Sequence, residues 1–254
     1  MDSSMIALVK IPLFFICALL YHWSATPPSP TTESTEEEYE SHEKSLPSVN
    51  RRIGRLEHPL FIWWTSNSLK GLYWGLGLAE VAMVLARQFP SSPLAAQILH
   101  LITGPNNPHI ADVGTPSLIY LAGAALVMIG SIIRIACFRV MGRQFTFRLT
   151  ILHNHKLITS GPYAVVRHPS YAGGMLQLLG AAMARFGPGS LWWEVMRHAL
   201  VGKVLFANML FSTGMAVYYF TRGEKEDEYL RKAFGSEWDE WARRVPDRYL
   251  PGIW

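Results

Sequence analysis

The sequence predicts an all-α protein, a polytopic membrane helix bundle with polar segments and further helices on its cytosolic side. Half of its 254 residues are hydrophobic and only 17% are charged, whereas a soluble domain carries about 25% charged residues. Several apolar runs approach the roughly 20 residues that a helix needs to cross a bilayer. The nine Trp residues also favour a chain that is anchored at membrane interfaces.

The first apolar run, residues 5–23, predicts an N-terminal span, although it contains Lys10. The small residues Ser24-Ala25-Thr26 leave a cleaved signal peptide open as an alternative. Residues 24–67 are predicted to be a polar cytosolic loop, because residues 24–58 are rich in Pro, Ser, Thr and Glu and cannot bury a core.

Two further spans, at residues 68–89 and 116–138, are predicted within the next region, 68–138. The connector between them contains four Pro residues and Gly104, which are typical of a loop. Its apolar middle, residues 94–102, predicts a short interfacial helix.

Residues 139–254 are predicted to hold two more spans and the C-terminal helices. The fourth span, 171–186, is rich in Gly and Ala, which suits close helix packing in a membrane. A break at Gly187-Pro188-Gly189 precedes the fifth span, 199–220. Beyond it we expect one helix that ends at Phe234-Gly235 and another, over 237–244, that ends before Pro246.

The distribution of charge predicts the orientation of the bundle. Residues 139–170 contain five Lys and Arg and no Asp or Glu, whereas the connector 90–115 contains no Lys or Arg. The positive-inside rule therefore places 139–170 and the C-terminal segment in the cytosol and the connector in the lumen. The basic stretch is equally suited to contact anionic lipid or to hold an anionic ligand.

Two polar segments on this cytosolic side carry the candidate chemistry. Gly161-Pro162 and Pro169 predict an irregular segment from Gly161 to His168, followed by the start of a helix at Pro169. The N-terminus of that helix can attract a carboxylate. In the second segment, Arg222 and Glu226 are four residues apart and thus share one face of a helix.

These motifs, in this order, resemble the isoprenylcysteine carboxyl methyltransferase family. The resemblance covers roughly residues 150–250. Two departures are Lys225, which interrupts the usual acidic run, and Gly223, which weakens the helix between Arg222 and Glu226. The matching motifs are His155-Lys-Leu-Ile-Thr-Ser-Gly161, Gly161-Pro-Tyr-x-x-x-Arg-His-Pro-x-Tyr-x-Gly173, Arg222-x-x-x-Glu226, Phe234-Gly235 and Arg244-Val-Pro246.

The resemblance implies an enzyme of the endoplasmic reticulum membrane that methylates the C-terminal carboxylate of prenylated cysteine, with its active site facing the cytosol. Its implied partners are the prenylated C-termini of proteins and the lipid bilayer, with no nucleic acid. Arg222 and Glu226 would be the catalytic residues. The segment from His155 to Tyr171 would form the fold's cytosolic cofactor-binding segment for S-adenosylmethionine, lined by His155, Leu157, Gly161, Tyr163, His168 and Tyr171 together with Glu226.

Elementary chemistry agrees with these roles. An α-carboxyl group has a pKa near 3.5 and is ionised at neutral pH, so that methylation needs positioning rather than a general base. The planar fork of Arg222 suits a carboxylate. An isoprenoid chain would enter sideways from the bilayer, for which the Gly- and Ala-rich fourth span leaves room, although tight helix packing explains the same composition.

Three alternatives remain at this point. A phospholipid N-methyltransferase of the phosphatidylethanolamine type would use the same cofactor but would need a base. An NADPH-dependent isoprenoid or sterol reductase shares part of the motif, and a non-catalytic membrane scaffold would use the polar segments only as interfaces. No metal site is expected, because His153 and His155 have no Cys or carboxylate at ligand spacing. The preferred prenyl length, the protein substrates and the oligomeric state are left open.

Overall fold

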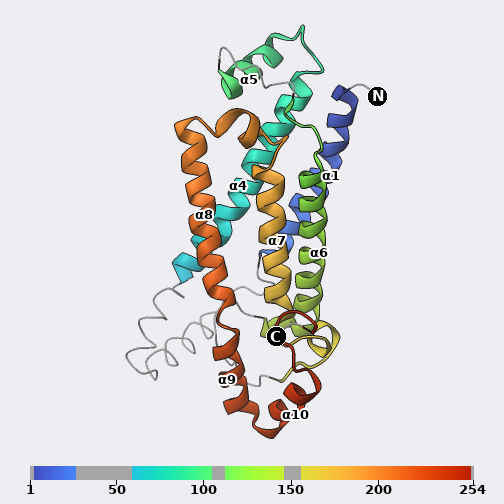
Figure 1. Cartoon of the computed structure of the whole chain (residues 1–254), viewed down its shortest axis with the longest axis vertical. Helices are drawn as coiled ribbons and strands as arrows, with labels where there is room; N and C mark the ends of the chain where they lie inside the picture. Colours follow the sequence, from blue (N-terminus) through green and yellow to red (C-terminus); the bar gives the residue numbers. More distant parts are fainter. Residues whose placement is uncertain (1–2, 27–58, 105–111, 146–155, 253–254) are drawn as a thin grey trace.

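The computed structural model describes residues 3–26, 59–104, 112–145 and 156–252 (Figure 1). Among these residues, five long α-helices run along an elongated bundle, with one short α-helix at one end and two at the other. This architecture confirms the predicted all-α bundle. The long helices are α1 (Ser3–Ser24), α4 (Pro59–Ala86), α6 (Leu118–Met141), α7 (Pro169–Phe186) and α8 (Leu200–Phe220), and the short ones are α5 (Pro93–Thr103), α9 (Gly223–Phe234) and α10 (Ser236–Arg244).

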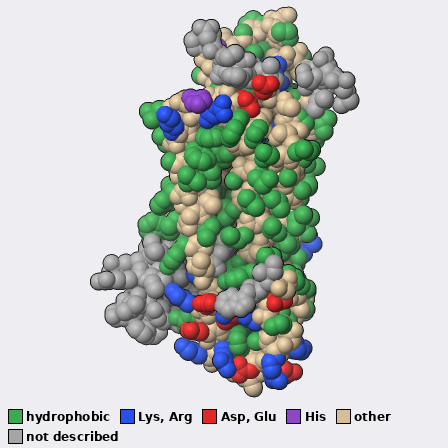
Figure 2. Space-filling model, in the orientation of Figure 1, with side chains coloured by type: hydrophobic (Ala, Val, Ile, Leu, Met, Phe, Trp, Pro, Cys, Tyr) green, Lys and Arg blue, Asp and Glu red, His purple; other side chains and the backbone are tan. Residues whose placement is uncertain are grey.

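Four helices among the described residues, α1, α4, α6 and α8, are long and apolar enough to cross a membrane. Hydrophobic side chains cover the middle of the visible face, whereas charged side chains gather towards the two ends (Figure 2). The sequence also predicted a span, the fourth of five, over residues 171–186 in α7, but this helix is not among the four. Its 18 residues include Gln177 and Arg185, which lower its apolar character.

Although it is less apolar, α7 lies against α6 along the bundle (Figure 1). A Cβ atom at Gly123 would lie 2.7 Å from the carbonyl oxygen of Gly180. A Cβ atom at Gly173 would lie 2.8 Å from the carbonyl oxygen of Gly130. The two backbones therefore approach each other through glycines, as the composition of this segment predicted.

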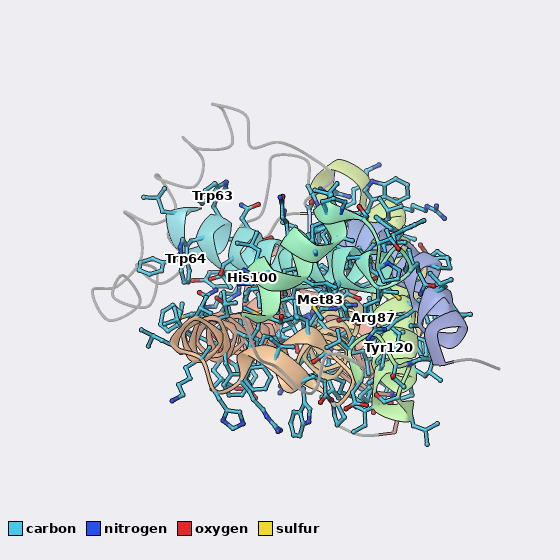
Figure 3. The ribbon with its side chains drawn as sticks, turned by 90° about the horizontal axis from the view of Figure 1, so that it is seen from above. Trp63, Trp64, Met83, Arg87, His100 and Tyr120 are labelled. Atoms are coloured by element: carbon cyan, nitrogen blue, oxygen red, sulfur yellow. The ribbon has the colours of Figure 1, made fainter. Side chains whose placement is uncertain are left out.

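The helix ends follow the expected signals except at the start of α4. This helix begins at Pro59, within the stretch predicted as a loop up to residue 67, because apolar residues 60–64 continue its pattern. Figure 3 looks down the bundle and shows Trp63 and Trp64 at its outer edge and Met83 inside it. The rest of the predicted loop, residues 27–58, lies outside the described residues.

The short helices lie close to their predicted positions. The α5 helix begins after Ser92, whose hydroxyl oxygen accepts a hydrogen bond from the backbone N–H of Ala95. The α9 helix ends at Phe234, before Gly235 with its φ of 56°. Figure 1 places α9 and α10 beside the start of α7, so that the C-terminal helices lie at the end of the bundle where α7 begins.

Candidate active site

The approach to α7 is a short irregular segment, as predicted. A 3₁₀ turn spans Gly161–Ala164, and α7 starts with Pro169 in its first turn after His168. Gly161 has a φ of 61°, and a Cβ atom there would lie 3.0 Å from Cγ2 of Val140. Gly161 therefore shapes the backbone of the segment through its conformation and lack of a side chain.

The start of α7 meets the start of α9. The hydroxyl of Tyr171 donates a hydrogen bond of 2.7 Å to Oε2 of Glu226, and Nδ1 of His168 lies 3.7 Å from the same oxygen. The rings of His168 and Tyr171 are stacked, with centroids 5.5 Å apart. The structure thus brings Glu226 into one group with His168 and Tyr171, although Tyr171 and Glu226 are 55 residues apart in the sequence.

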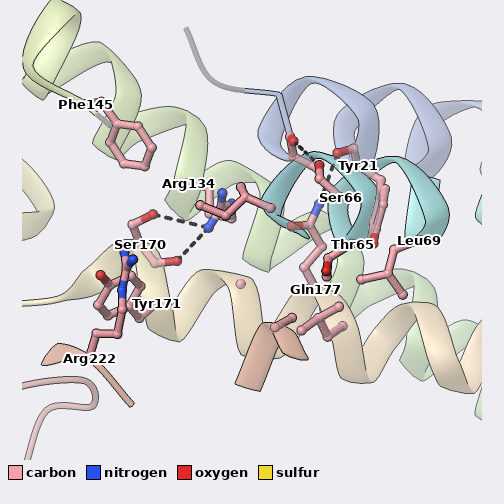
Figure 4. A pocket seen from close by; sticks show the side chains of 15 residues that line it. Tyr21, Thr65, Ser66, Leu69, Arg134, Phe145, Ser170, Tyr171, Gln177 and Arg222 are labelled. Atoms are coloured by element: carbon pink, nitrogen blue, oxygen red, sulfur yellow. Dashed lines mark hydrogen bonds between the residues drawn. The ribbon is translucent and has the colours of Figure 1, made fainter. Parts of the chain in front are cut away.

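Arg222 immediately precedes α9 and is buried. Its side chain lies beside Tyr171 at one end of a cavity (Figure 4). The next residue, Gly223, leaves room for the hydroxyl of Tyr249, which a Cβ atom at this position would strike. The glycine that the sequence analysis regarded as a weak point of the helix is therefore required by packing.

Residues 245–249, here called the C-terminal clasp, close over the irregular segment. The backbone N–H groups of Arg167 and His168 donate hydrogen bonds of 2.9 and 2.7 Å to the carbonyls of Asp247 and Arg248. The guanidinium of Arg167 donates to the carbonyls of Val245 and Pro246, at 3.0 and 2.7 Å. The clasp therefore holds the segment in place through its backbone carbonyls, which accept hydrogen bonds from the backbone of the segment and from the side chain of Arg167.

Asp227 is a residue of this site that the sequence analysis did not predict. Its Oδ1 lies 3.0 Å from Nε2 of His168, and its Oδ2 lies 3.3 Å from Nε of both Arg167 and Arg248. Burial raises the pKa of Asp227, but the hydrogen bond with His168 and the charges of His168, Arg167 and Arg248 outweigh it and hold the pKa below its usual value. Its position next to Glu226 was the only available signal.

Two predicted residues lie in a hydrophobic cluster outside the cavity. Leu157 and Tyr163 pack with Phe138 and Trp241. The hydroxyl of Tyr163 lies 2.8 Å from Sδ of Met141, and burial raises its pKa well above the usual value. These two residues therefore support the segment through this hydrophobic cluster. The predicted His155 lies outside the described residues.

The cavity of about 130 Å³ lies between α1, α4, α6, α7 and α8. At one end it is lined by Arg222, Tyr171, Ser170 and a second guanidinium, that of Arg134 (Figure 4). Arg134, which the sequence analysis did not single out, donates hydrogen bonds to the carbonyls of Ser24 and Ser170, at 2.7 and 3.1 Å. Much of the remaining lining is apolar and includes Ile62, Leu69, Gly174, Leu178 and Ala216.

Comparison with known proteins shows which sequences are similar to this one. A model of the isoprenylcysteine carboxyl methyltransferase family matches residues 123–189, which include most of α6, the irregular segment and all of α7.

Protein-S-isoprenylcysteine O-methyltransferase B of Arabidopsis thaliana is 29% identical over 126 residues, 49% of this chain and 55% of that protein. A probable protein-S-isoprenylcysteine O-methyltransferase of Oryza sativa subsp. indica is 26% identical over 170 residues, 66% of this chain and 78% of that protein. The enzyme of Schizosaccharomyces pombe is 26% identical over 132 residues, 51% of this chain and 49% of that protein. The chain thus spans about half the length of the Arabidopsis and Schizosaccharomyces relatives. The family match falls on the helices that build the site, so it is in this part that the chain is similar to the isoprenylcysteine carboxyl methyltransferase family.

Proposed function

We propose that this protein transfers a methyl group from S-adenosylmethionine to the C-terminal carboxylate of prenylated cysteine. The observation that carries the proposal is the cavity itself, which combines guanidinium groups at one end with a lining that is largely apolar elsewhere. Such a cavity suits an amphiphile whose anionic head is joined directly to a hydrocarbon chain. Prenylated cysteine has this chemistry, and the names of the related proteins agree with it.

Arg222 is proposed to bind the carboxylate. Its guanidinium is planar and permanently charged, and it can hold both oxygens of a carboxylate at once. Tyr171 lies beside it, hydrogen-bonded to Glu226, so that the charges near the reacting oxygen are held in place before the substrate arrives. Holding the reacting groups in position can contribute roughly 7–11 kcal/mol to catalysis.

The group formed by His168, Tyr171, Tyr249 and Glu226 fits the proposed cofactor. Aromatic faces attract a cation such as a sulfonium, and the ring of Tyr249 lies 5.8 Å from that of His168. The side chain of Glu226 is 30% exposed and can accept hydrogen bonds from an amino group. Leu157, Gly161 and Tyr163 would support this site, and His155 is proposed to complete it.

When bound, S-adenosylmethionine supplies a methyl group on a positively charged sulfur, and transfer to the carboxylate leaves a methyl ester and a neutral thioether. No proton is transferred, so the residues of the site need only bind, orient and exclude water. A site from which water is partly excluded favours the reaction, because water stabilises the separated charges more than the transition state.

We further propose that the protein resides in the endoplasmic reticulum membrane with this end of the bundle in the cytosol. The basic stretch 139–170, the clasp and α9 would then lie on the side where prenylated proteins are found. This orientation follows from the positive-inside rule.

The test uses the purified full-length protein in lipid–detergent micelles with radiolabelled S-adenosylmethionine. N-acetyl-S-farnesylcysteine and phosphatidylethanolamine are offered in parallel. We expect base-labile label on the farnesylcysteine, and we expect Arg222→Ala to lower kcat/KM about 100-fold or more, the effect of removing a group that binds transition-state charge. Arg222→Lys should restore little of this loss, because it lacks the planar fork.

Arg231→Ala is the matched control. Arg231 lies on α9, the helix that Arg222 precedes, and its side chain is 64% exposed, so its removal should leave the activity unchanged. Label on phosphatidylethanolamine alone would instead indicate an N-methyltransferase. Absence of label on both substrates would reject the methyltransferase proposal.

A further inference from the structure

A large groove lies between α4 and α8, in the part of the bundle nearer to α5. Its volume is about 550 Å³, against about 130 Å³ for the cavity at Arg222. Its lining on α4 runs from Ser68 to Ala79, and its lining on α8 runs from Val201 to Asn208. In the part of the chain that the structure describes, the two spaces share no lining residue. The groove is therefore separate from the candidate active site.

The α4 wall of this groove has the composition of a helix-packing face. Gly71 and Gly75 line it, and a Cβ atom at either position would have open space around it for 4 Å. The glycines between α6 and α7 differ, because a Cβ atom at Gly123 would lie 2.7 Å from the carbonyl oxygen of Gly180. Small residues let another group come close to a helix backbone. Among the described residues, no side chain takes this place beside Gly71 and Gly75.

The groove is bounded at both ends along the bundle. At one end, Nδ2 of Asn208 donates a hydrogen bond of 2.7 Å to the hydroxyl oxygen of Ser68, which joins α8 to α4. At the other end, Ala79, Ile102 of α5 and Met196 pack against the same hydrophobic cluster. A helix from a second copy would have to run past both ends, and these contacts block it. A flexible hydrocarbon chain can enter sideways between α4 and α8.

The length of the groove corresponds to one leaflet of a bilayer. The α4 lining from Ser68 to Ala79 extends over about 16 Å at the rise of an α-helix. The hydrocarbon core of a bilayer is about 30 Å thick, so that one leaflet contributes about 15 Å. Both α4 and α8 are long and apolar enough to cross a membrane. The groove therefore has the length and the surroundings of a single lipid chain.

The α8 helix would gain most from such a ligand. Only 17% of its apolar stretch is buried, against 39–44% for α1, α4 and α6. Arg197 and Lys203 lie next to the start of α8, and Figure 2 shows Lys and Arg side chains near this end of the helix. Both residue types bind phosphate. The charges at the start of α8 thus suit the phosphate of a lipid whose chain occupies the groove.

We propose that the groove binds one acyl chain of a bilayer phospholipid, from the leaflet on the α5 side, and that this chain holds α8 against α4. The volume lies within the range of about 300–1,000 Å³ that is usual for ligand pockets. Because Arg222 follows shortly after the end of α8, the bound chain also steadies the helix that leads to the candidate site. The inference does not depend on methyl transfer.

The experiment measures how added phospholipid changes the melting temperature of the purified full-length protein after lipid has been removed in detergent. Dioleoylphosphatidylcholine should raise it by roughly 5 °C or more, as expected for a saturating ligand. Gly71→Leu and Gly75→Leu fill the groove without a clash and should each at least halve this shift. Phosphatidylcholine with a photoreactive acyl chain should crosslink to residues 68–79 and 201–208 in the unaltered protein and not in these variants.

Gly214→Leu is the matched control, because Gly214 lies on α8, has the same open space around its Cβ position and does not line the groove. Its shift and crosslinks should equal those of the unaltered protein. Absence of a shift in the unaltered protein, or groove variants that keep the full shift and the crosslinks, would overturn the inference. If one groove variant does not fold, the other decides, and if neither folds, the crosslinks of the unaltered protein decide.

Two other occupants have their own outcomes. A dimer that light scattering detects in the unaltered protein and not in Gly75→Leu would assign the groove to a second copy. Displacement of the photoreactive lipid by N-acetyl-S-farnesylcysteine would assign it to an isoprenoid chain. Either result would overturn the inference. Since none of these measurements uses methyl transfer, their failure is distinct from a failure of the proposed function.

Discussion

Among the described residues, buried ion pairs occur at two places along this bundle, and these two groups differ in what surrounds them. Near the start of α7, Asp227 pairs with His168, Arg167 and Arg248 next to Glu226, whose side chain is 30% exposed. Further along the bundle, Lys10, Glu80 and Arg185 meet between α1, α4 and α7.

The second group is enclosed. The side chains of Lys10, Glu80 and Arg185 are at most 5% exposed. Lys10 also donates a hydrogen bond of 3.1 Å to the carbonyl of Gly189 and lies over the ring of Tyr120. Charged side chains inside membrane bundles are often regarded as functional sites. The comparison shows that exposure separates the two groups, because Glu226 beside the first is partly exposed and is bonded to Tyr171, which lines the cavity at Arg222.

The enclosed group should therefore affect stability and the open one should affect activity. Glu80→Ala leaves two cations, Lys10 and Arg185, without their carboxylate. Breaking a buried ion pair in this way costs about 3–5 kcal/mol of unfolding free energy. We expect a large loss of thermal stability in detergent, while the fraction that remains folded keeps its kcat. Unfolding curves and activity per folded molecule measure the two effects, and an unchanged stability of Glu80→Ala would contradict the comparison.

Asp227→Asn should have a smaller effect on stability and a larger one on activity. The substitution keeps the shape of the side chain but removes the charge that His168, Arg167 and Arg248 share. Hydrogen bonds to charged groups contribute about 1.5–3 kcal/mol. We expect a stability loss of this size, together with a lower kcat, because His168 loses its fixed orientation.

Asp239→Asn is the control for this variant. Asp239 pairs with Arg231 at the surface, 2.8 Å away, and its side chain is 43% exposed. Exposed pairs contribute about 1 kcal/mol or less. Equal losses of unfolding free energy in Asp227→Asn and Asp239→Asn would show that the burial of Asp227 adds nothing to the stability of its ion pairs.

The lowered pKa of Asp227 also predicts a smaller, pH-dependent effect on the stability of the protein. The pKa of Asp227 in the folded protein is below its usual value of 3.8, so the unfolded chain binds a proton more readily than the folded one. The stabilisation is therefore complete above the unfolded pKa and is lost as the pH falls through the folded pKa. We expect the melting temperature to fall less steeply on acidification in Asp227→Asn than in the unaltered protein. Parallel profiles would contradict this prediction.

The sequence predicted the helices of the bundle well, because their signals are local. Apolar runs indicated α1, α6 and α8, Pro169 marked the start of α7, and Gly235 marked the end of α9. The start of α4 was placed too late, since residues 60–64 are apolar but follow a polar stretch that looked like one continuous loop.

The candidate site was predictable only in part. The family motif indicated His168, Tyr171, Arg222 and Glu226, and the described structure brings these residues to one end of the bundle. The motif did not indicate Asp227, because neighbouring acidic residues on a polar helix look alike in the sequence until tertiary packing buries one of them. Lys10 was visible in its apolar run, but its partner Glu80 lies 70 residues away, and only the packing of α1 against α4 pairs them.

The C-terminal clasp has a consequence for biosynthesis. Residues 245–249 are synthesised after every membrane helix of the bundle, yet their carbonyls accept the hydrogen bonds that hold Arg167 and His168 at the start of α7. The ribosome therefore completes the membrane helices that the structure describes before the parts of the candidate site can come together. Synthesis of these helices and assembly of the candidate site are therefore successive steps, and the clasp supplies the contacts that complete the second.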